Sequence, residues 1–289
     1  DHPVPSGDRL MARMLVASLE AAGHKVDLVS DLRAYIGRSD DDVARARLVA
    51  DARQERRRIA ALWSSGARPD LWFSYHSYYK SPDLLGPMLA AQFAIPLVTC
   101  EASFSARRDV GIWAGMQADA MEAVRIAALN ITLTARDRAG LQLIAPQGRF
   151  GQLAPFIDTA PFAKPPLPDP GHLVAVAMMR SGDKLESYRA LAAALSHLPA
   201  GSGWRLTIAG DGPARPEVEA LFAGHPPGRV EFSGPLDVAG VADLLSRAAV
   251  YVWPGQGEAY GLAYLEAQAA GVPVVACRTA GVPEVVTDG

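Results

Sequence analysis

Two glutamates flank a glycine-containing turn near the end of the chain. Glu258 lies in the stretch GQGEAYGL, and Glu266 follows it after seven intervening residues. Gly257 and Gly261 bound the turn, and the pattern after them predicts a helix that begins near Leu262. Both carboxylates can then face a ligand whose phosphate rests on the free amides at the helix N-terminus. A carboxylate accepts two hydrogen bonds at once, which suits paired sugar hydroxyls.

The same pair has a simpler interpretation, in which Glu258 caps the helix and Glu266 is a solvated side chain. The surrounding residues favour a ligand site. The chain has PGQGEAYGL, LEAQAAGVPVV and AGVPE between residues 254 and 284. These stretches resemble the signature of the retaining, GT-B fold glycosyltransferases of glycosyltransferase family 4, which reads P-S-x-x-E-G-F-G-L, L-E-A-M-A-x-G-x-P-V-V and G-G-x-x-E. Two departures are Ala259 in place of Gly and Gln268 in place of Met.

The resemblance implies roles for these residues. Glu258 is expected beside the donor sugar, and Glu266 is expected to hold the ribose hydroxyls. Backbone amides that contact the sugar and the diphosphate would come from Ala259, Tyr260, Gly261 and Leu262.

Two cations follow a predicted strand in the same half of the chain. Arg180 ends the stretch VAMMR and Lys184 lies four residues on, similar to the family's R-x-x-x-x-K-G, although the spacing is one residue shorter and Leu185 replaces the Gly. The resemblance implies that both cations face the diphosphate. Fixed cations stabilise the charge on a departing phosphate without a metal. The alternative is that both are ordinary surface charges.

Two glycine turns in this half also match family turns. IAGDGP, with Gly210 and Gly212, resembles the family's G-x-G-P, and VEFSGPL, with Pro235 and Leu236, resembles V-x-F-x-G. The resemblance implies that these turns frame the nucleotide base. Both turns could equally serve only the fold.

The first half of the chain matches less of the family pattern and is expected to bind the acceptor. PSGDR, with Ser6 and Gly7, resembles a glycine-rich acceptor-side loop, although Ser6 is also a typical N-cap. Glu101 follows the stretch PLVTC where many relatives carry His, and a carboxylate there can accept the acceptor's proton or hold sugar hydroxyls. We expect acceptor contacts from His76 and Arg107, with packing as the alternative role for His76.

Helical and strand patterns alternate along the chain and must position these residues. In the first half the patterns predict a helix over 8–22, a strand over 25–30, a helix over 42–64, a strand over 70–75, a helix after residue 82, a strand over 96–100, a helix to about 127 and a strand over 129–134. In the second half they predict strands over 173–177, 204–210, 229–234, 249–254 and 273–277, with helices between them, the last over 262–270. Such alternation requires parallel sheets with crossover helices.

A proline-rich stretch, 155–171, separates the two series and predicts a linker. We therefore predict an α/β protein of two Rossmann-like domains with parallel sheets, residues 1–163 for the acceptor and 164–289 for the nucleotide-sugar. The resemblance implies the GT-B arrangement, in which the two sheets face each other across a cleft. The sequence begins in a loop without a preceding strand and stops directly after a turn, so we expect further elements at both ends.

Composition excludes several other classes of protein. The chain has 289 residues, with 28 Lys and Arg against 31 Asp and Glu, so its net charge of −3 indicates no nucleic-acid partner. Two cysteines without a CxxC spacing argue against a disulfide framework or a structural zinc site. Apolar stretches are shorter than the roughly 20 residues of a membrane helix. The acidic run 40–42 precedes a helix, so capping is favoured over metal binding, and no metal or cofactor is expected.

These expectations describe a cytoplasmic enzyme. The predicted helix over 42–64 is basic, which allows peripheral contact with the inner face of a membrane, but a solvated face that covers the core is favoured. The resemblance implies a hexosyltransferase that moves a sugar from a UDP- or GDP-linked donor to a carbohydrate or glycolipid acceptor, with retention of anomeric configuration. The alternatives are a sugar-nucleotide epimerase or hydrolase of the same fold, and a non-catalytic module that binds nucleotide-sugar.

Overall fold

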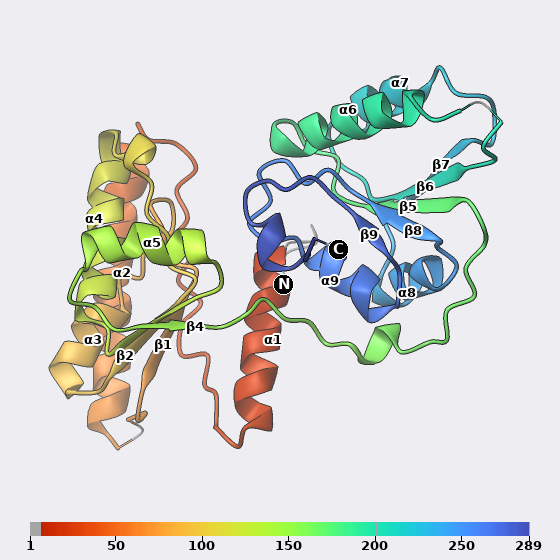
Figure 1. Ribbon diagram of the computed structural model, residues 1–289. Helices are drawn as coiled ribbons and strands as arrows, with labels where there is room; N and C mark the ends of the chain where they lie inside the picture. The colour runs from red at the N-terminus through yellow and green to blue at the C-terminus, as the bar shows by residue number, and fades with distance from the viewer. Residues whose placement is uncertain (1–6, 67, 200, 289) are drawn as a thin grey trace. The chain divides into compact units, whose positions relative to one another are not determined.

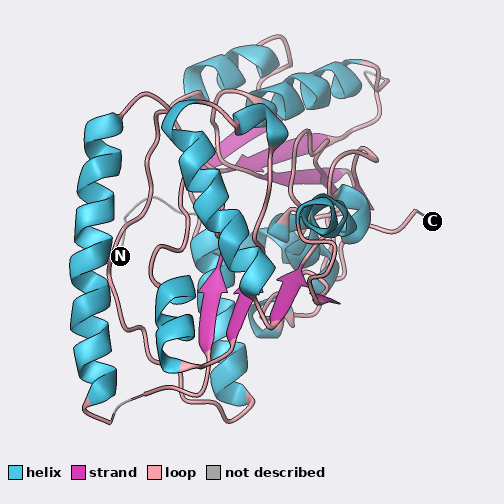
Figure 2. Cartoon of the chain, turned by 90° about the vertical axis from the view of Figure 1, so that its left-hand side faces the viewer, coloured by secondary structure: helices cyan, strands magenta, loops and turns pink. Residues whose placement is uncertain are grey.

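The structure, a computed structural model, describes residues 7–66, 68–199 and 201–288. The chain divides into two compact units, Asp1–Ala154 and Pro155–Gly289. Each unit contains one parallel β-sheet flanked by helices, as Figures 1 and 2 show. Both units therefore have the predicted Rossmann-like architecture.

Unit 1 has a four-stranded sheet in the order β1-β2-β3-β4, and every neighbouring pair is parallel. Its strands are β1 Trp72–Tyr75, β2 Leu97–Cys100, β3 Leu129–Thr132 and β4 Phe150–Gln152. Its helices are α1 Gly7–Ala21, α2 Asp42–Ser64, α3 Gly86–Phe93, α4 Gly111–Ile126 and α5 Ala135–Ile144, with a 3₁₀ turn at Ala106–Arg108. Crossover helices connect the parallel strands, as this topology requires.

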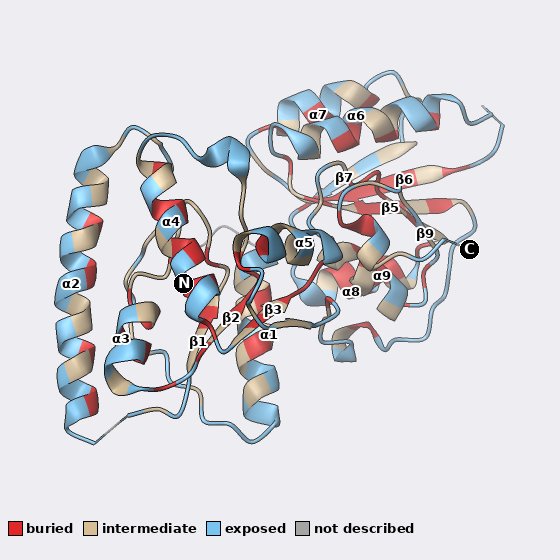
Figure 3. Cartoon of the chain, turned by 60° about the vertical axis from the view of Figure 1, so that its left-hand side comes forward, coloured by how far each residue is buried: buried red, intermediate tan, exposed pale blue. Residues whose placement is uncertain are grey.

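The basic helix α2 covers the core of unit 1 with its apolar side. Its buried residues are Leu48, Ala52, Ile59 and Trp63. Figure 3 shows the buried parts of α2 on the side that faces the rest of the unit. The carboxylate of Asp41 accepts a hydrogen bond from the amide of Ala44, 2.9 Å away, and so caps the helix. Capping and core covering are thus the roles of this segment in the structure.

Unit 2 has a five-stranded parallel sheet in the order β7-β6-β5-β8-β9. Its strands are β5 His172–Val176, β6 Arg205–Ala209, β7 Val230–Gly234, β8 Val250–Val252 and β9 Val274–Val275. Its helices are α6 Asp183–Ser196, α7 Arg215–Phe222, α8 Val238–Ser246 and α9 Leu262–Ala269. The chain adds β6 and β7 on one side of β5 and then adds β8 and β9 on the other. In open α/β sheets the crevice at such a reversal is the usual ligand site.

The predicted strand over 25–30 is wrong. These residues form no regular element, and the side chain of Leu28 is 85% exposed. A strand needs a hydrogen-bonded neighbour, and β1 is the edge strand of the sheet on the described part of the chain. The structure also adds α5 and β4, which the sequence patterns did not indicate.

The boundary between the units lies between residues 154 and 155, whereas the prediction placed it between 163 and 164. Phe162 is buried in the core of unit 2. The linker also bonds to unit 2, because the amides of Leu167 and Asp169 donate to the carbonyls of Ser246 and Arg247. The proline-rich stretch is therefore part of unit 2. None of the described helices combines the length and apolar character that crossing a bilayer requires.

Candidate functional site

The residues predicted to bind the donor follow neighbouring strands of unit 2. All strands of the sheet are parallel, so their carboxyl ends lie along one edge. In the order of the sheet, the predicted residues are Pro235 and Leu236 after β7, Gly210 and Gly212 after β6, Arg180 and Lys184 after β5, and Glu258 after β8. Lys184 and Glu258 thus follow the two strands between which the chain order reverses.

Lys184 and Glu258 contact each other directly. Nζ of Lys184 binds Oε1 of Glu258, and their side chains are 26% and 12% exposed. The same Oε1 accepts a hydrogen bond of 2.9 Å from Nε1 of Trp253, whose ring centroid lies 5.6 Å from the ammonium. Trp253 is itself buried against Tyr188. A buried indole therefore holds the carboxylate, and the carboxylate holds the cation.

The loop that carries Glu258 is fixed by contacts with two other segments. The amide of Gln256 donates to the hydroxyl of Ser187 on α6 at 2.9 Å. The amide of Gly281 donates to the carbonyl of Glu258 at 3.0 Å. A Cβ at Gly281 would lie 1.3 Å from the carbonyl oxygen of Ala259, so only glycine permits this approach. The stretch AGVPE thus supports the glutamate loop.

Glu266 lies on α9, one turn beyond Leu262, where its side chain is half-buried. This burial raises the pKa of Glu266 above its ordinary value. Among the described residues, Glu266 forms no ion pair. Burial is the main cause that raises the pKa of Tyr251, and the charges of Glu266 and Glu258 add to the rise, so both glutamates act on the same hydroxyl. A half-buried carboxylate without a cation near the reversal of the sheet is suited to bind ligand hydroxyls.

The two predicted glycines after β6 have a packing role. A Cβ at Gly210 would lie 1.9 Å from the carbonyl oxygen of Ala177, and one at Gly212 would lie 2.2 Å from that of Met179. Their absent side chains let the end of β6 approach the end of β5. Pro235, Leu236 and Arg180 are exposed at the same edge, and no ion pair of Arg180 occurs in the part of the chain that the structure describes.

In unit 1 the structure brings His76 and Glu101 together. They directly follow β1 and β2, and the distance from Nδ1 of His76 to Oε2 of Glu101 is 3.8 Å. Burial lowers the pKa of His76, but the facing carboxylate of Glu101 and the charges of Asp8 and Asp137 outweigh it, so the pKa of His76 is raised. This pair occupies the strand ends where the acceptor was expected.

The other residues predicted on the acceptor side are less informative. Gly7 is the first residue of α1, and Ser6 lies outside the described residues. Arg107 is exposed in the 3₁₀ turn after β2, and within the described ranges it forms no ion pair. The structure does not bring Arg107 into contact with the pair formed by His76 and Glu101.

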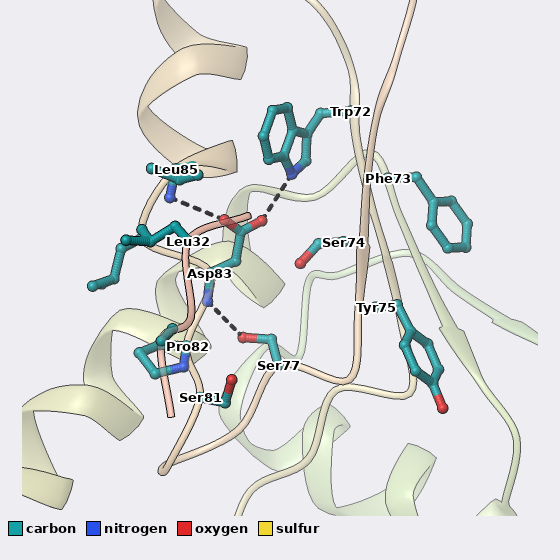
Figure 4. Close-up of a pocket in the computed structure, with 12 residues that line it drawn as sticks. Leu32, Trp72, Phe73, Ser74, Tyr75, Ser77, Ser81, Pro82, Asp83 and Leu85 are labelled. Atoms are coloured by element: carbon teal, nitrogen blue, oxygen red, sulfur yellow. Dashed lines mark hydrogen bonds between the residues drawn. The ribbon is translucent and has the colours of Figure 1, made fainter. Parts of the chain in front are cut away.

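A cavity of about 230 Å³ lies elsewhere in unit 1, along β1. Figure 4 shows Asp83 in this cavity, with its carboxylate bound to Nε1 of Trp72 at 2.8 Å and to the amide of Leu85 at 3.0 Å. The amide of Asp83 donates to the hydroxyl of Ser77. These hydrogen bonds fix the start of α3, so the carboxylate of Asp83, the indole of Trp72 and the hydroxyl of Ser77 already have structural partners. We therefore place the candidate chemistry at the strand ends.

Trp253 and the two contacts between predicted residues have no signal in the sequence. Trp253 directly precedes the matched motif, and an aromatic residue there gave no chemical signal. Lys184 is 74 residues from Glu258, and His76 is 25 residues from Glu101. Only the order and register of the strands bring such residues together.

Comparisons with known proteins agree with this description of the fold and of unit 2. Residues 171–289 match the protein family described as "Glycosyl transferases group 1". In fold, 96% of the chain aligns with 77% of sucrose-phosphate synthase from Thermosynechococcus elongatus, with a TM-score of 0.67 and 20% identity. The chain therefore consists of two Rossmann-like domains, and its structural neighbours include GT-B glycosyltransferases.

Two curated relatives match parts of the sequence. Sulfoquinovosyl transferase SQD2 of Arabidopsis thaliana is 36% identical over 84 residues, which are 29% of this chain and 16% of that protein. The GDP-mannose-dependent alpha-(1-6)-phosphatidylinositol dimannoside mannosyltransferase of Mycobacterium tuberculosis is 36% identical over 119 residues, 41% of this chain and 30% of that protein. The chain thus covers less than a third of either relative.

Proposed function

We propose that this chain transfers a hexose from a UDP- or GDP-linked donor to a hydroxyl of a carbohydrate or lipid acceptor, with retention of anomeric configuration. The observation that carries the proposal is the contact between Lys184 and Glu258 at the reversal of the unit 2 sheet. Both residues belong to the segment that matches the glycosyl transferase family. The transferred sugar would lie beside Glu258, and the ribose hydroxyls would bind Glu266.

In this proposal the cations stabilise the leaving group. As the bond between the anomeric carbon and the diphosphate breaks, negative charge develops on the phosphate oxygens. Lys184 is held in place by Glu258 and, through it, by Trp253, and Arg180 follows the same strand. Preorganised cations at that point lower the barrier. The chemistry then needs no divalent metal, so we expect turnover to persist in EDTA.

The first test is nucleotide binding to the whole chain. Thermal shift with a panel of nucleotide-sugars, including GDP-mannose because of the mycobacterial relative, identifies the donor. Lys184→Ala and Glu266→Ala should each weaken binding of UDP or GDP by about 10-fold or more, since hydrogen bonds to charged groups are worth about 1.5–3 kcal/mol. Circular dichroism should be unchanged.

A matched control is Lys164→Ala. Lys164 also belongs to unit 2 and also pairs with a carboxylate, that of Asp243, but both side chains are more than half exposed. Its substitution should leave nucleotide affinity unchanged. Unaltered affinity in both Lys184→Ala and Glu266→Ala would remove the assignment of the site.

Product analysis separates the alternatives. A transferase needs an acceptor and gives a product whose anomeric proton has the coupling constant of the donor. An epimerase or hydrolase of this fold would consume nucleotide-sugar without an acceptor. A non-catalytic module would bind the nucleotide and turn over nothing. Cytoplasmic location and contact with a membrane surface belong to the same proposal and are tested by fractionating cells that produce the protein.

A further inference from the structure

His76 and Glu101 form a carboxylate and imidazole pair at the ends of two adjacent strands. The amide of His76 donates to the carbonyl of Cys100, and the amide of Glu101 donates to the carbonyl of Ile131, both at 2.9 Å. These bonds continue the pairing of β1 with β2 and of β2 with β3. The backbone of both residues is therefore fixed by the sheet.

Both residues have an uncommon backbone conformation. The φ angle is +56° at His76 and +55° at Glu101, in the left-handed region that non-glycine residues seldom adopt. Such a conformation is energetically unfavourable and is concentrated at functional sites. Two consecutive strands that end in this way turn both side chains to a common position.

The facing atoms of the pair are buried. Nδ1 of His76 and Oε2 of Glu101 have no hydrogen-bond partner among the described residues. Their separation of 3.8 Å is about 1 Å longer than a hydrogen bond. Catalytic hydrogen bonds are often long in a ligand-free structure and tighten when the reactants bind. Nδ1 of His76 and Oε2 of Glu101 are therefore placed to form a hydrogen bond with each other.

The outward part of the ring is accessible. The side chain of His76 is 30% exposed, although its Nδ1 is buried. Nε2 is not among the buried side-chain atoms that lack a partner in the described structure, so we assign the exposed part of the ring to the side that carries Nε2. The side chain of Glu101 is 10% exposed, and its Oε2 is buried where it faces Nδ1 of His76.

We infer that Nε2 of His76 takes the proton from the acceptor hydroxyl, and that Glu101 is a positioning residue that holds Nδ1–H. This inference rests on the proposed transfer reaction. This assignment moves to His76 the proton-accepting role that the sequence suggested for Glu101. A carboxylate on one imidazole nitrogen fixes the tautomer and orientation of the ring, and it stabilises the imidazolium that forms.

The proton and the electron pairs balance in this step. The acceptor oxygen forms a bond to the anomeric carbon while the bond from that carbon to the diphosphate oxygen breaks. The acceptor proton moves to Nε2 of His76, and the nucleoside diphosphate leaves with the electron pair of the broken bond. The imidazolium later returns the proton to solvent.

Charged groups around the ring favour the role of His76 as proton acceptor. Asp8 on α1, Asp137 on α5 and Glu101 after β2 all raise the pKa of His76, whereas burial lowers it. The rings of Tyr75 and Tyr78 lie 5.6 and 5.0 Å from the imidazole. Burial raises the pKa of Tyr78 to about 12, and it also raises the pKa of Cys100 to about 12, so both groups stay protonated at neutral pH.

The test begins with an NMR titration of the histidines in the ligand-free full chain. In Glu101→Gln the pKa of His76 should fall, because burial remains and the facing charge is lost. His172 in unit 2 is the internal control, and its titration should not change. An unchanged pKa of His76 in Glu101→Gln would overturn the assignment of Glu101.

The second measurement uses His76→Asn. Asparagine tolerates the left-handed backbone and keeps a polar atom near the position of Nδ1, but it has no counterpart of Nε2. Transfer should fall by about 10²–10⁴-fold, the usual contribution of a general base. Nucleotide affinity should stay the same. A His76→Asn chain with transfer close to wild type would refute the role of Nε2.

The pH profile of kcat/KM separates a catalytic role of His76 from a structural role, because a structural role would not shift the profile. A base must be neutral, so kcat/KM rises with pH through the pKa of His76, and this limb should shift to lower pH in Glu101→Gln. A limb that does not move contradicts the inference. A wild-type chain that binds no nucleotide and has no turnover would refute the proposed function and the proton transfer together, whereas the NMR titration still decides whether Glu101 and His76 are coupled.

Discussion

Glu266 shows how a residue proposed to bind a ligand can lower the stability of the protein that carries it. Its side chain is half-buried on α9, and this partial burial raises its pKa. Below the ordinary pKa the group is protonated in both the folded and the unfolded chain, so burial has no electrostatic cost. As pH rises through the raised folded pKa, the half-buried group must ionise and the free energy of unfolding decreases. At neutral pH the ionised Glu266 is therefore expected to lower the free energy of unfolding of the ligand-free protein.

We predict that Glu266→Gln raises the melting temperature of unit 2 in the ligand-free chain at neutral pH and weakens nucleotide binding. The gain in melting temperature should shrink as pH falls to about 4, where the native glutamate is also protonated. Differential scanning calorimetry across this pH range measures the effect. Glu231→Gln, at an exposed position on β7, is the control and should change neither property. A variant less stable than wild type at neutral pH would contradict the prediction.

The proximity of two predicted residues follows from their positions after neighbouring strands of the unit 2 sheet. Glu258 and Lys184 were both expected at the donor, and the structure places them in contact. Trp253 was not predictable, because an indole before a proline is equally typical of a core position. The contact of His76 with Glu101 was not predictable either, since it depends on the register of β1 against β2.

At the scale of elements, the loop that carries Glu258 depends on the segment after β9. The amide of Gly281 donates to the carbonyl of Glu258, and a Cβ at Gly281 would also lie 3.2 Å from that carbonyl oxygen. The closest atom to this Cβ is backbone, the carbonyl oxygen of Ala259. Backbone cannot rotate away as a side chain can, so a methyl group there must displace the loop.

We therefore predict that Gly281→Ala weakens nucleotide binding by about 10-fold or more, as expected when a charge-assisted contact of 1.5–3 kcal/mol is lost. Isothermal titration calorimetry with UDP or GDP measures it. Gly224→Ala is the matched control in the same unit, because a Cβ at Gly224 meets no atom within 4 Å. That variant should stay within about 0.5 kcal/mol of wild-type stability. Equal nucleotide affinity of Gly281→Ala and Gly224→Ala would show that the loop that carries Glu258 accommodates the added methyl group.

Elements with a strong local pattern were predicted well, and those that need a partner were not. All five strands of unit 2 lie where the runs predict them. The run WRLTIAG forms β6, which is buried along most of its length, as expected of an apolar strand inside a parallel sheet. The stretch 25–30 has a similar local pattern, but it forms no strand because no strand beside it supplies hydrogen bonds in the described structure. The short β4 is the converse case. Its three residues have little local pattern, but they form a strand because they pair with β3.

At the scale of the whole molecule, each unit has its own hydrophobic core. One cluster of unit 2 extends in sequence from Phe162 to Val282 and includes Leu206, which is 1% exposed. A cluster of unit 1 contains Leu89, which is fully buried. Each of these clusters draws its members from a single unit. Separate cores permit separate cooperative unfolding, for which one melting temperature is not defined.

We predict two calorimetric transitions that can be assigned by mutation. Leu206→Ala should lower one transition and Leu89→Ala the other, each by about 2–5 kcal/mol, because each leaves a cavity in one core. UDP or GDP at about 100 times its Kd should raise only the transition that Leu206→Ala lowers, by about 2.7 kcal/mol. This follows because the candidate nucleotide site is built from residues of unit 2 alone. A single transition that both substitutions lower would mean that the two units unfold as one, and a nucleotide effect on the Leu89 transition would place the nucleotide in unit 1.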